Sequence, residues 1–133
     1  MEAPWSQPVA LLAGAVLGVA SAEPVRRSAG RAGVLIAGGA LVGAAVIYPA
    51  LRRDRTPSAG LAVEAGVVAA TSALAVVAAG RSPRAGRRLL AVGWAAHALF
   101  DFGQGPSEDS RLPGWYAPVC AGYDFAYAAR IAF

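Results

Sequence analysis

Residues 32–51 read AGVLIAGGALVGAAVIYPAL, twenty residues without a charged side chain. A helix needs about 20 predominantly apolar residues to cross the hydrocarbon core of a bilayer. Lipid offers the backbone no hydrogen-bond partner, so such a segment must be helical. A strand of a membrane β-barrel would alternate apolar and polar residues, which this segment does not do. The stretch therefore predicts a transmembrane helix.

Four further apolar runs flank this segment, and we expect helices at residues 5–22, 61–80, 86–102 and 117–133. The fourth helix reaches span length only if its first residues extend into the interface, where arginine side chains can snorkel. The chain has 133 residues, of which 56% are hydrophobic and 15% charged. Soluble domains carry about a quarter of charged residues. We therefore predict an all-α fold, a single integral membrane domain over residues 1–133 with about five transmembrane helices.

The composition excludes several classes of protein. The chain has a single cysteine, Cys120, which excludes a disulfide scaffold. His97 is the only histidine, which excludes zinc fingers and His-rich membrane oxygenases. No lysine is present, so a Walker A phosphate loop is excluded. The basic isoelectric point could suit nucleic acid, but the arginines lie in short turns between apolar runs, so we expect no nucleic-acid partner.

The charged residues predict an orientation in the membrane. One side of the five helices carries eight arginines and one acid, Glu23, whereas the other side carries four arginines and four acids. The positive-inside rule then places the N-terminus outside and the C-terminus in the cytoplasm of a bacterial inner membrane. The aromatic residues expected at the outer interface are Trp5, Tyr48, Trp115 and Tyr116.

A cleaved signal peptide is the alternative for the first helix. Residues 20–22, Ala-Ser-Ala, resemble a cleavage site after an apolar stretch. Residues 1–8 contain no Lys or Arg, although a signal peptide begins with basic residues. We expect the helix to be retained, and the sequence leaves cleavage open.

Small residues at a spacing of four predict close helix packing. Gly14 and Gly18 form one such pair, and Gly39 and Gly43 form another. In lipid, small residues let helix backbones approach each other closely. Packing within one bundle is the simpler interpretation, and a homodimer is the alternative.

Ionisable side chains interrupt three of the apolar runs. Placing a charged group at the bilayer centre costs about 2.5–3.5 kcal/mol on insertion scales, so such residues are candidates for function. His97 and Asp101 lie one helical turn apart, as do Cys120 and Asp124. From their positions along the helices, we expect Glu64, His97, Asp101 and Asp124 to meet in the outer half of the bundle. The candidate catalytic residues are Asp124, His97, Asp101 and Glu64.

Aromatic residues accompany this group. Trp94 shares the helix face of His97, and Tyr123 and Tyr127 flank Asp124. Their ring faces could stabilise a transient cation. The candidate substrate-binding residues are Trp94, Tyr123, Tyr127, Tyr116 and Trp115.

The residue types favour acid–base chemistry. Three buried carboxylates beside one imidazole would repel each other, so at least one carboxyl group should retain its proton. A protonated carboxyl group beside a carboxylate forms an acid–base pair. We expect an isomerase, cyclase or hydratase that takes a lipophilic, isoprenoid-like or lipid-like substrate directly from the bilayer.

Three alternatives remain open. Chains of acidic and histidine residues in membranes also serve proton- or ion-coupled transporters and channels. A divalent metal could bind His97 and Asp101, joined by Glu64, Asp124 or Cys120; no other cofactor is expected. In a non-catalytic assembly or scaffold protein, the same polar residues would only hold helices together.

Residues 93–125 contain GWAAHALFDF and GWYAPVCAGYDF. This region resembles a pattern found in uncharacterised small bacterial multi-pass membrane proteins, of the form H-A-x-x-D, then W-Y, then C-x-x-Y-D. The resemblance implies a shared architecture, and no activity is attached to it.

Overall fold

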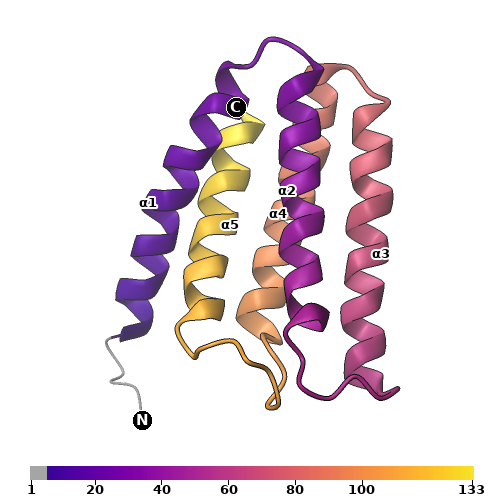
Figure 1. Ribbon diagram of the computed structural model, residues 1–133. Helices are drawn as coiled ribbons and strands as arrows, with labels where there is room; N and C mark the ends of the chain where they lie inside the picture. The colour runs from indigo at the N-terminus through magenta and orange to yellow at the C-terminus, as the bar shows by residue number, and fades with distance from the viewer. Residues whose placement is uncertain (1–5) are drawn as a thin grey trace.

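The computed structural model describes residues 6–133 and folds them into five α-helices (Figure 1). They are α1 (Ser6–Arg27), α2 (Arg31–Ala50), α3 (Ala59–Ala79), α4 (Pro83–Gly103) and α5 (Tyr116–Ala132). The helices lie side by side, and consecutive helices run in opposite directions. The expected all-α fold with five helices is confirmed for these residues. Trp5, expected at the start of the first helix and in the interface, lies outside the described residues.

Two helices extend three residues or more beyond their predicted bounds. We expected the first to end at residue 22, but α1 continues to Arg27, where Glu23 lies 3.3 Å from the Arg27 Nε one turn later. Ion pairs at this spacing support a helix. We expected the fourth to begin at residue 86, but α4 begins at Pro83. The Ser82 hydroxyl caps it by accepting a hydrogen bond from the Ala85 N–H, and proline suits a first helical position.

Three helices, α1, α2 and α3, are long and apolar enough to cross a membrane. Large apolar side chains on these helices point outward: Leu12 is 68% exposed and Val76 is 73% exposed. Monomeric soluble proteins rarely expose broad apolar surfaces. The exposed apolar surface and the three long helices indicate association with a membrane.

Glycines bring α1 and α5 into backbone contact. A Cβ atom at Gly14 would lie 1.9 Å from the Val119 carbonyl oxygen, and one at Gly122 would lie 2.0 Å from the Leu11 carbonyl oxygen. Any side chain here would push the two helices apart. By contrast, a Cβ at Gly39 or at Gly43 would meet no atom within 4 Å. The first predicted glycine pair therefore packs within the bundle, whereas the second lies outside its close contacts.

Helix α4 contacts three other helices, α2, α3 and α5. The Trp94 indole N–H donates a hydrogen bond of 3.2 Å to the Ala37 carbonyl and so fixes α4 against α2. Polar side chains on α4 can therefore meet residues from three neighbouring helices.

The two arginine-rich turns lie at the same end of the bundle, and the longer loops lie at the other end (Figure 1). The longer loops are joined to each other: the Arg111 N–H donates to the Leu51 carbonyl at 2.9 Å, and the Asp54 N–H donates to Asp109 Oδ2 at 3.0 Å. Hydrogen bonds from the Ser107 hydroxyl and from this N–H hold the pKa of Asp109 below its usual value. These contacts tie the α2–α3 loop to the α4–α5 loop.

Candidate functional site

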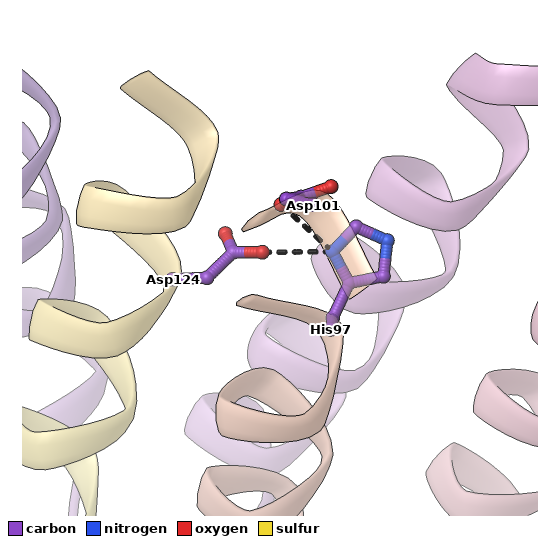
Figure 2. A group of neighbouring side chains, drawn as sticks. All are labelled: His97, Asp101 and Asp124. Carbon is purple, nitrogen blue, oxygen red and sulfur yellow. Dashed lines mark hydrogen bonds and ion pairs between the residues drawn. The ribbon is translucent and has the colours of Figure 1, made fainter. Parts of the chain in front are cut away.

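His97, Asp101 and Asp124 form a buried cluster between α4 and α5 (Figure 2). His97 Nδ1 lies 2.7 Å from Asp124 Oδ2 and 3.3 Å from Asp101 Oδ2. When Asp124 is ionised, its carboxylate can only accept a hydrogen bond, so in that state the shared proton is on His97 Nδ1. The structure therefore brings together three of the four predicted catalytic residues.

Tyr48 is a fourth member of this cluster, and the sequence analysis missed it. Its hydroxyl donates a hydrogen bond to Asp101 Oδ1, and the side chain is only 2% exposed. We expected Tyr48 in the interfacial aromatic belt because it lies near the end of its helix. The sequence did contain a signal for this contact. Tyr48 and Asp101 both lie near the loop end of their helices, so their side chains lie at the same depth in the bundle.

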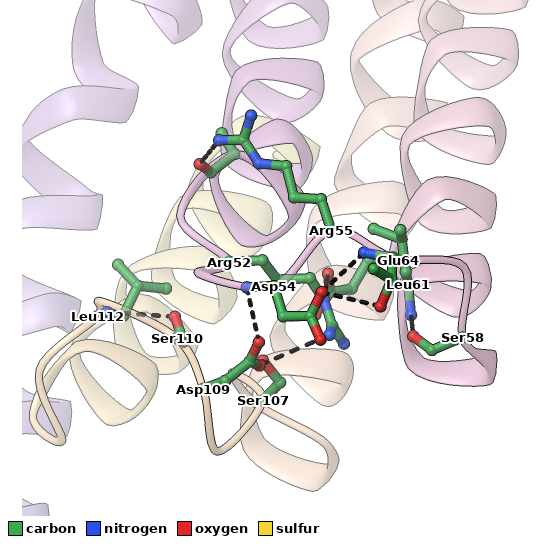
Figure 3. Close-up of polar contacts among 12 residues, drawn as sticks. Arg52, Asp54, Arg55, Ser58, Leu61, Glu64, Ser107, Asp109, Ser110 and Leu112 are labelled. Atoms are coloured by element: carbon green, nitrogen blue, oxygen red, sulfur yellow. Dashed lines mark hydrogen bonds and ion pairs between the residues drawn. The ribbon is translucent and has the colours of Figure 1, made fainter.

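Glu64 does not join the cluster, contrary to our expectation. Its carboxylate accepts a 2.6 Å hydrogen bond from Arg52 Nε, and Arg52 also lies 3.6 Å from Asp109 (Figure 3). Arg52 follows the end of its helix, so its position along the chain does not place it at the depth of Glu64. Its long side chain reaches back to Glu64 and neutralises it, so this pair joins α3 to the two loops.

Two polar atoms of the cluster have no hydrogen-bond partner among the described residues. They are His97 Nε2 and Asp101 Oδ2, and both are buried. Figure 2 shows the second ring nitrogen of His97 turned away from both carboxylates. A buried polar group without a partner is costly, and it often marks a functional position. The cluster thus retains unused hydrogen-bonding capacity at two atoms.

His97, Asp101 and Asp124 each line a different cavity. Asp124 lines a cavity of about 500 Å³ between α2 and α5, and His97 lines one of about 210 Å³ between α3 and α4. Asp101 lines a third cavity, of about 310 Å³, together with Gln104 and other residues of the α4–α5 loop. The first two are walled mainly by apolar side chains, whereas the third lies at the loop end of the bundle.

The predicted aromatic residues are distributed unevenly around these cavities. Trp94, Tyr116 and Tyr123 line the α2–α5 cavity, where Cys120 also lies beside Asp124. Tyr127 is buried behind Trp94, with 4.6 Å between the ring centroids. Trp115 is 54% exposed at the loop end. Three of the five predicted aromatic residues therefore share one cavity with Asp124, and the other two lie outside its wall.

The cluster also contains a set of ligand atoms that could coordinate a metal cation. His97, Asp101 and Asp124 can each offer one ligand atom, and these atoms lie within 4.8 Å of one another. Imidazole with two carboxylates is a donor set found around several divalent metals. Of the metal-ligand sets considered from the sequence, the geometry favours this one over sets that include Glu64 or Cys120.

Comparison with protein-family models, with curated proteins and with solved structures finds no match.

Proposed function

We propose that the protein is a membrane-integral enzyme that isomerises, cyclises or hydrates a lipophilic, isoprenoid-like or lipid-like substrate by acid–base catalysis. One observation carries the proposal: Asp124 stands in the wall of an apolar cavity of about 500 Å³ while its carboxylate contacts His97. Ligand sites are usually concave, mostly apolar and supplied with a few converging polar groups. This cavity has that composition.

In the proposed chemistry, Asp124 exchanges protons with the substrate. The protonated carboxyl group donates its proton to one carbon of a double bond, which leaves a cation on the neighbouring carbon. The ring faces of Trp94 and Tyr123, which line the same cavity, stabilise that cation. Return of a proton from an adjacent carbon to the carboxylate moves the double bond and restores the acid. Attack by water on the cation gives a protonated alcohol, which returns its extra proton to the Asp124 carboxylate. Attack by a second double bond closes a ring and leaves a new cation, which loses a proton from an adjacent carbon to the same carboxylate.

His97 and Asp101 prepare Asp124 for both steps. The Nδ1 proton of His97 bonds to the Asp124 carboxylate and stabilises it after it has lost its proton. Asp101 lies 3.3 Å from the same nitrogen, and Tyr48 holds Asp101 in turn. Because Asp101 also lines the cavity at the loop end, it offers a route for water and protons to reach the cluster.

The proposed setting is a bacterial inner membrane that all five helices cross, with the N-terminus outside and the C-terminus in the cytoplasm. Three helices have the length and composition of membrane spans, and the arginine-rich turns share one end of the bundle. The positive-inside rule places that end in the cytoplasm. The α2–α5 cavity then opens toward lipid, which suits a substrate that arrives from the bilayer.

Transport is the second candidate, and the position of the polar residues argues against it. A transporter needs a polar path to both sides of the membrane. The buried polar residues among residues 6–133 lie in the middle or toward the loop end of their helices; they are Glu64, Thr71, His97, Asp101 and Asp124. Polar residues confined to one half of the bundle favour catalysis over the transport of a solute or ion across the membrane.

The test is a comparison of lipid extracts from cells that do and do not express the chain. We expect wild-type protein to convert at least one lipid species. Asp124→Asn should lower product formation by a factor of about 10² or more, because removing a general acid–base group costs about 10²–10⁴ in rate. His97→Ala should lower it as well.

The matched control is Glu23→Gln, which makes the same carboxylate-to-amide change at the arginine-rich end, far from the cluster. Its lipid profile should match that of wild type. Identical profiles with and without the wild-type chain would refute the proposal. If a chelator abolished product formation and a divalent metal restored it, the metal-free mechanism would be wrong. The result would instead indicate a metal site formed by His97, Asp101 and Asp124.

A further inference from the structure

A second site lies at the other end of the bundle, away from the His97 cluster. Two cavities adjoin there, of about 290 Å³ and about 360 Å³, and Arg88 and Ala132 line both. The first is walled mainly by arginine side chains, and the second is an apolar groove between α4 and α5. A strongly basic cavity thus leads directly into an apolar one.

The basic cavity is lined by Arg84, Arg87 and Arg88, together with Ala132 and Phe133. Arg87 also donates a hydrogen bond of 3.5 Å to the Ser28 carbonyl. Glu23 is the one acid in the described chain at this end, and it is occupied elsewhere: it accepts a 2.5 Å hydrogen bond from Arg130 and lies 3.3 Å from Arg27. Within residues 6–133, Arg84 and Arg88 form no ion pair. Three neighbouring guanidinium groups that form no ion pair within residues 6–133 favour binding of an anion, and guanidinium matches phosphate geometry closely.

The apolar groove follows one face of each helix. Residues of α4 and α5 spaced three, four and seven apart line it, and five of them are alanines. Their small side chains leave a channel that spans about two helical turns, or about 10 Å at 1.5 Å per residue. The lining residues beside Arg88 are Ala91, Val92, Ala95, Phe125, Ala128, Ala129 and Ala132.

We propose that this is a binding site for an anionic phospholipid. The headgroup phosphate binds Arg84, Arg87 and Arg88, and one acyl chain lies in the groove between α4 and α5. Charge complementarity selects an anion, and the continuous apolar groove selects a lipid over a free phosphate. Basic pockets between membrane helices are known to bind anionic headgroups. The site is independent of the chemistry proposed at Asp124, because it shares no residue with it.

The test is native mass spectrometry of the full chain, stripped of lipid and then offered equal amounts of dioleoyl-phosphatidylglycerol and dioleoyl-phosphatidylcholine. Wild type should retain phosphatidylglycerol preferentially. The double variant Arg84→Gln with Arg88→Gln should weaken its binding about tenfold or more, given about 1 kcal/mol per arginine near a lipid phosphate. Glycerol phosphate, which has a headgroup but no acyl chains, should not displace it.

Two further variants make the outcome decisive. Ala129→Phe fills the groove at an exposed position and leaves the arginines intact, so it should also weaken binding. Arg31→Gln removes an exposed arginine at the same end, outside both cavities, and should bind like wild type. Equal retention of both lipids, unchanged binding by Ala129→Phe, or an equal loss in Arg31→Gln would each overturn the proposal. Thermal unfolding of each variant confirms that it is folded.

Discussion

Tyr48 shows how one hydroxyl group can stabilise a buried carboxylate. Its hydroxyl donates a hydrogen bond to one carboxylate oxygen of Asp101, a residue that is only 2% exposed. The other oxygen, Oδ2, has no hydrogen-bond partner among the described residues. The Tyr48 hydroxyl therefore stabilises Asp101 more than the same hydrogen bond would stabilise an exposed carboxylate.

We predict that Tyr48→Phe lowers the free energy of unfolding by about 1–3 kcal/mol, because it leaves a buried acceptor unpaired. Unfolding of the detergent-solubilised protein, followed by circular dichroism, measures the change. The control is Tyr123→Phe, which removes a phenol hydroxyl that makes no hydrogen bond in the described structure. An equal stability of wild type and Tyr48→Phe would contradict the assigned role of the hydroxyl.

The sequence predicts much of the candidate site at the scale of residues. The spacing of His97 and Asp101 places them on one face of a helix, and an ionisable residue in an apolar run points to Asp124. The partner of each group is harder to predict, because it depends on side-chain reach. Arg52 lies beyond the end of α2 but contacts Glu64 inside the bundle, so position along the helix alone misassigns both residues.

At the scale of helices, the contact between α1 and α5 rests on glycines. A Cβ at Gly122 would collide with the Leu11 carbonyl oxygen, and backbone cannot move aside as a flexible side chain can. A Cβ at Gly39 would meet nothing within 4 Å. Replacing glycine with alanine should therefore affect the stability of the protein in opposite ways at Gly122 and Gly39.

We predict that Gly122→Ala destabilises the protein, because α1 and α5 must separate to admit the methyl group. Gly39→Ala should leave the stability unchanged or raise it by up to about 1 kcal/mol, since alanine favours a helix over glycine. Thermal unfolding in the same detergent compares the two variants. Equal effects of the two substitutions would show that the α1–α5 contact does not limit stability.

The contact between the two long loops should depend on pH. Asp109 has a pKa below its usual value of 3.8, because the Ser107 hydroxyl and the Asp54 N–H bond to its ionised form. A lowered pKa in the folded state stabilises the protein above the unfolded value, and this stabilisation is lost as the pH falls through the folded value.

We therefore predict that the unfolding temperature falls as the pH is lowered below 3.8, and that part of this fall is absent in Asp109→Asn. Melting curves at successive pH values measure it. Parallel curves for wild type and variant over this range would contradict the contribution of Asp109.

For the whole molecule, the sequence predicts the number of helices but not their neighbours. Apolar runs separated by charged turns are sufficient to count five helices. Helix pairing is normally read from an apolar face, but here the outward and inward faces are both apolar, as the exposure of Leu12 and Val76 shows. The association of α1 with α5, at opposite ends of the chain, could therefore not be predicted from the pattern.

The proposed orientation can be tested with cysteine labelling. In a Cys120→Ala background, we predict that Glu108→Cys reacts with a membrane-impermeant maleimide on intact cells, because the proposed orientation places its loop outside. Ser82→Cys, in an arginine-rich turn, should react only after the membrane is permeabilised. The opposite pattern would reverse the topology, and labelling of both on intact cells would show that the five-span arrangement is wrong.

In the proposed chemistry, Asp124 exchanges protons with a lipophilic substrate in the α2–α5 cavity. The most direct measurement is deuterium uptake, with purified protein incubated in D₂O with extracted membrane lipids and the products analysed by mass spectrometry. We predict protein-dependent deuterium at carbon in an unsaturated lipid, lost in Asp124→Asn and retained in Glu23→Gln. Lipids that carry no deuterium after incubation with wild type, or equal uptake with Asp124→Asn, would contradict acid–base catalysis by Asp124.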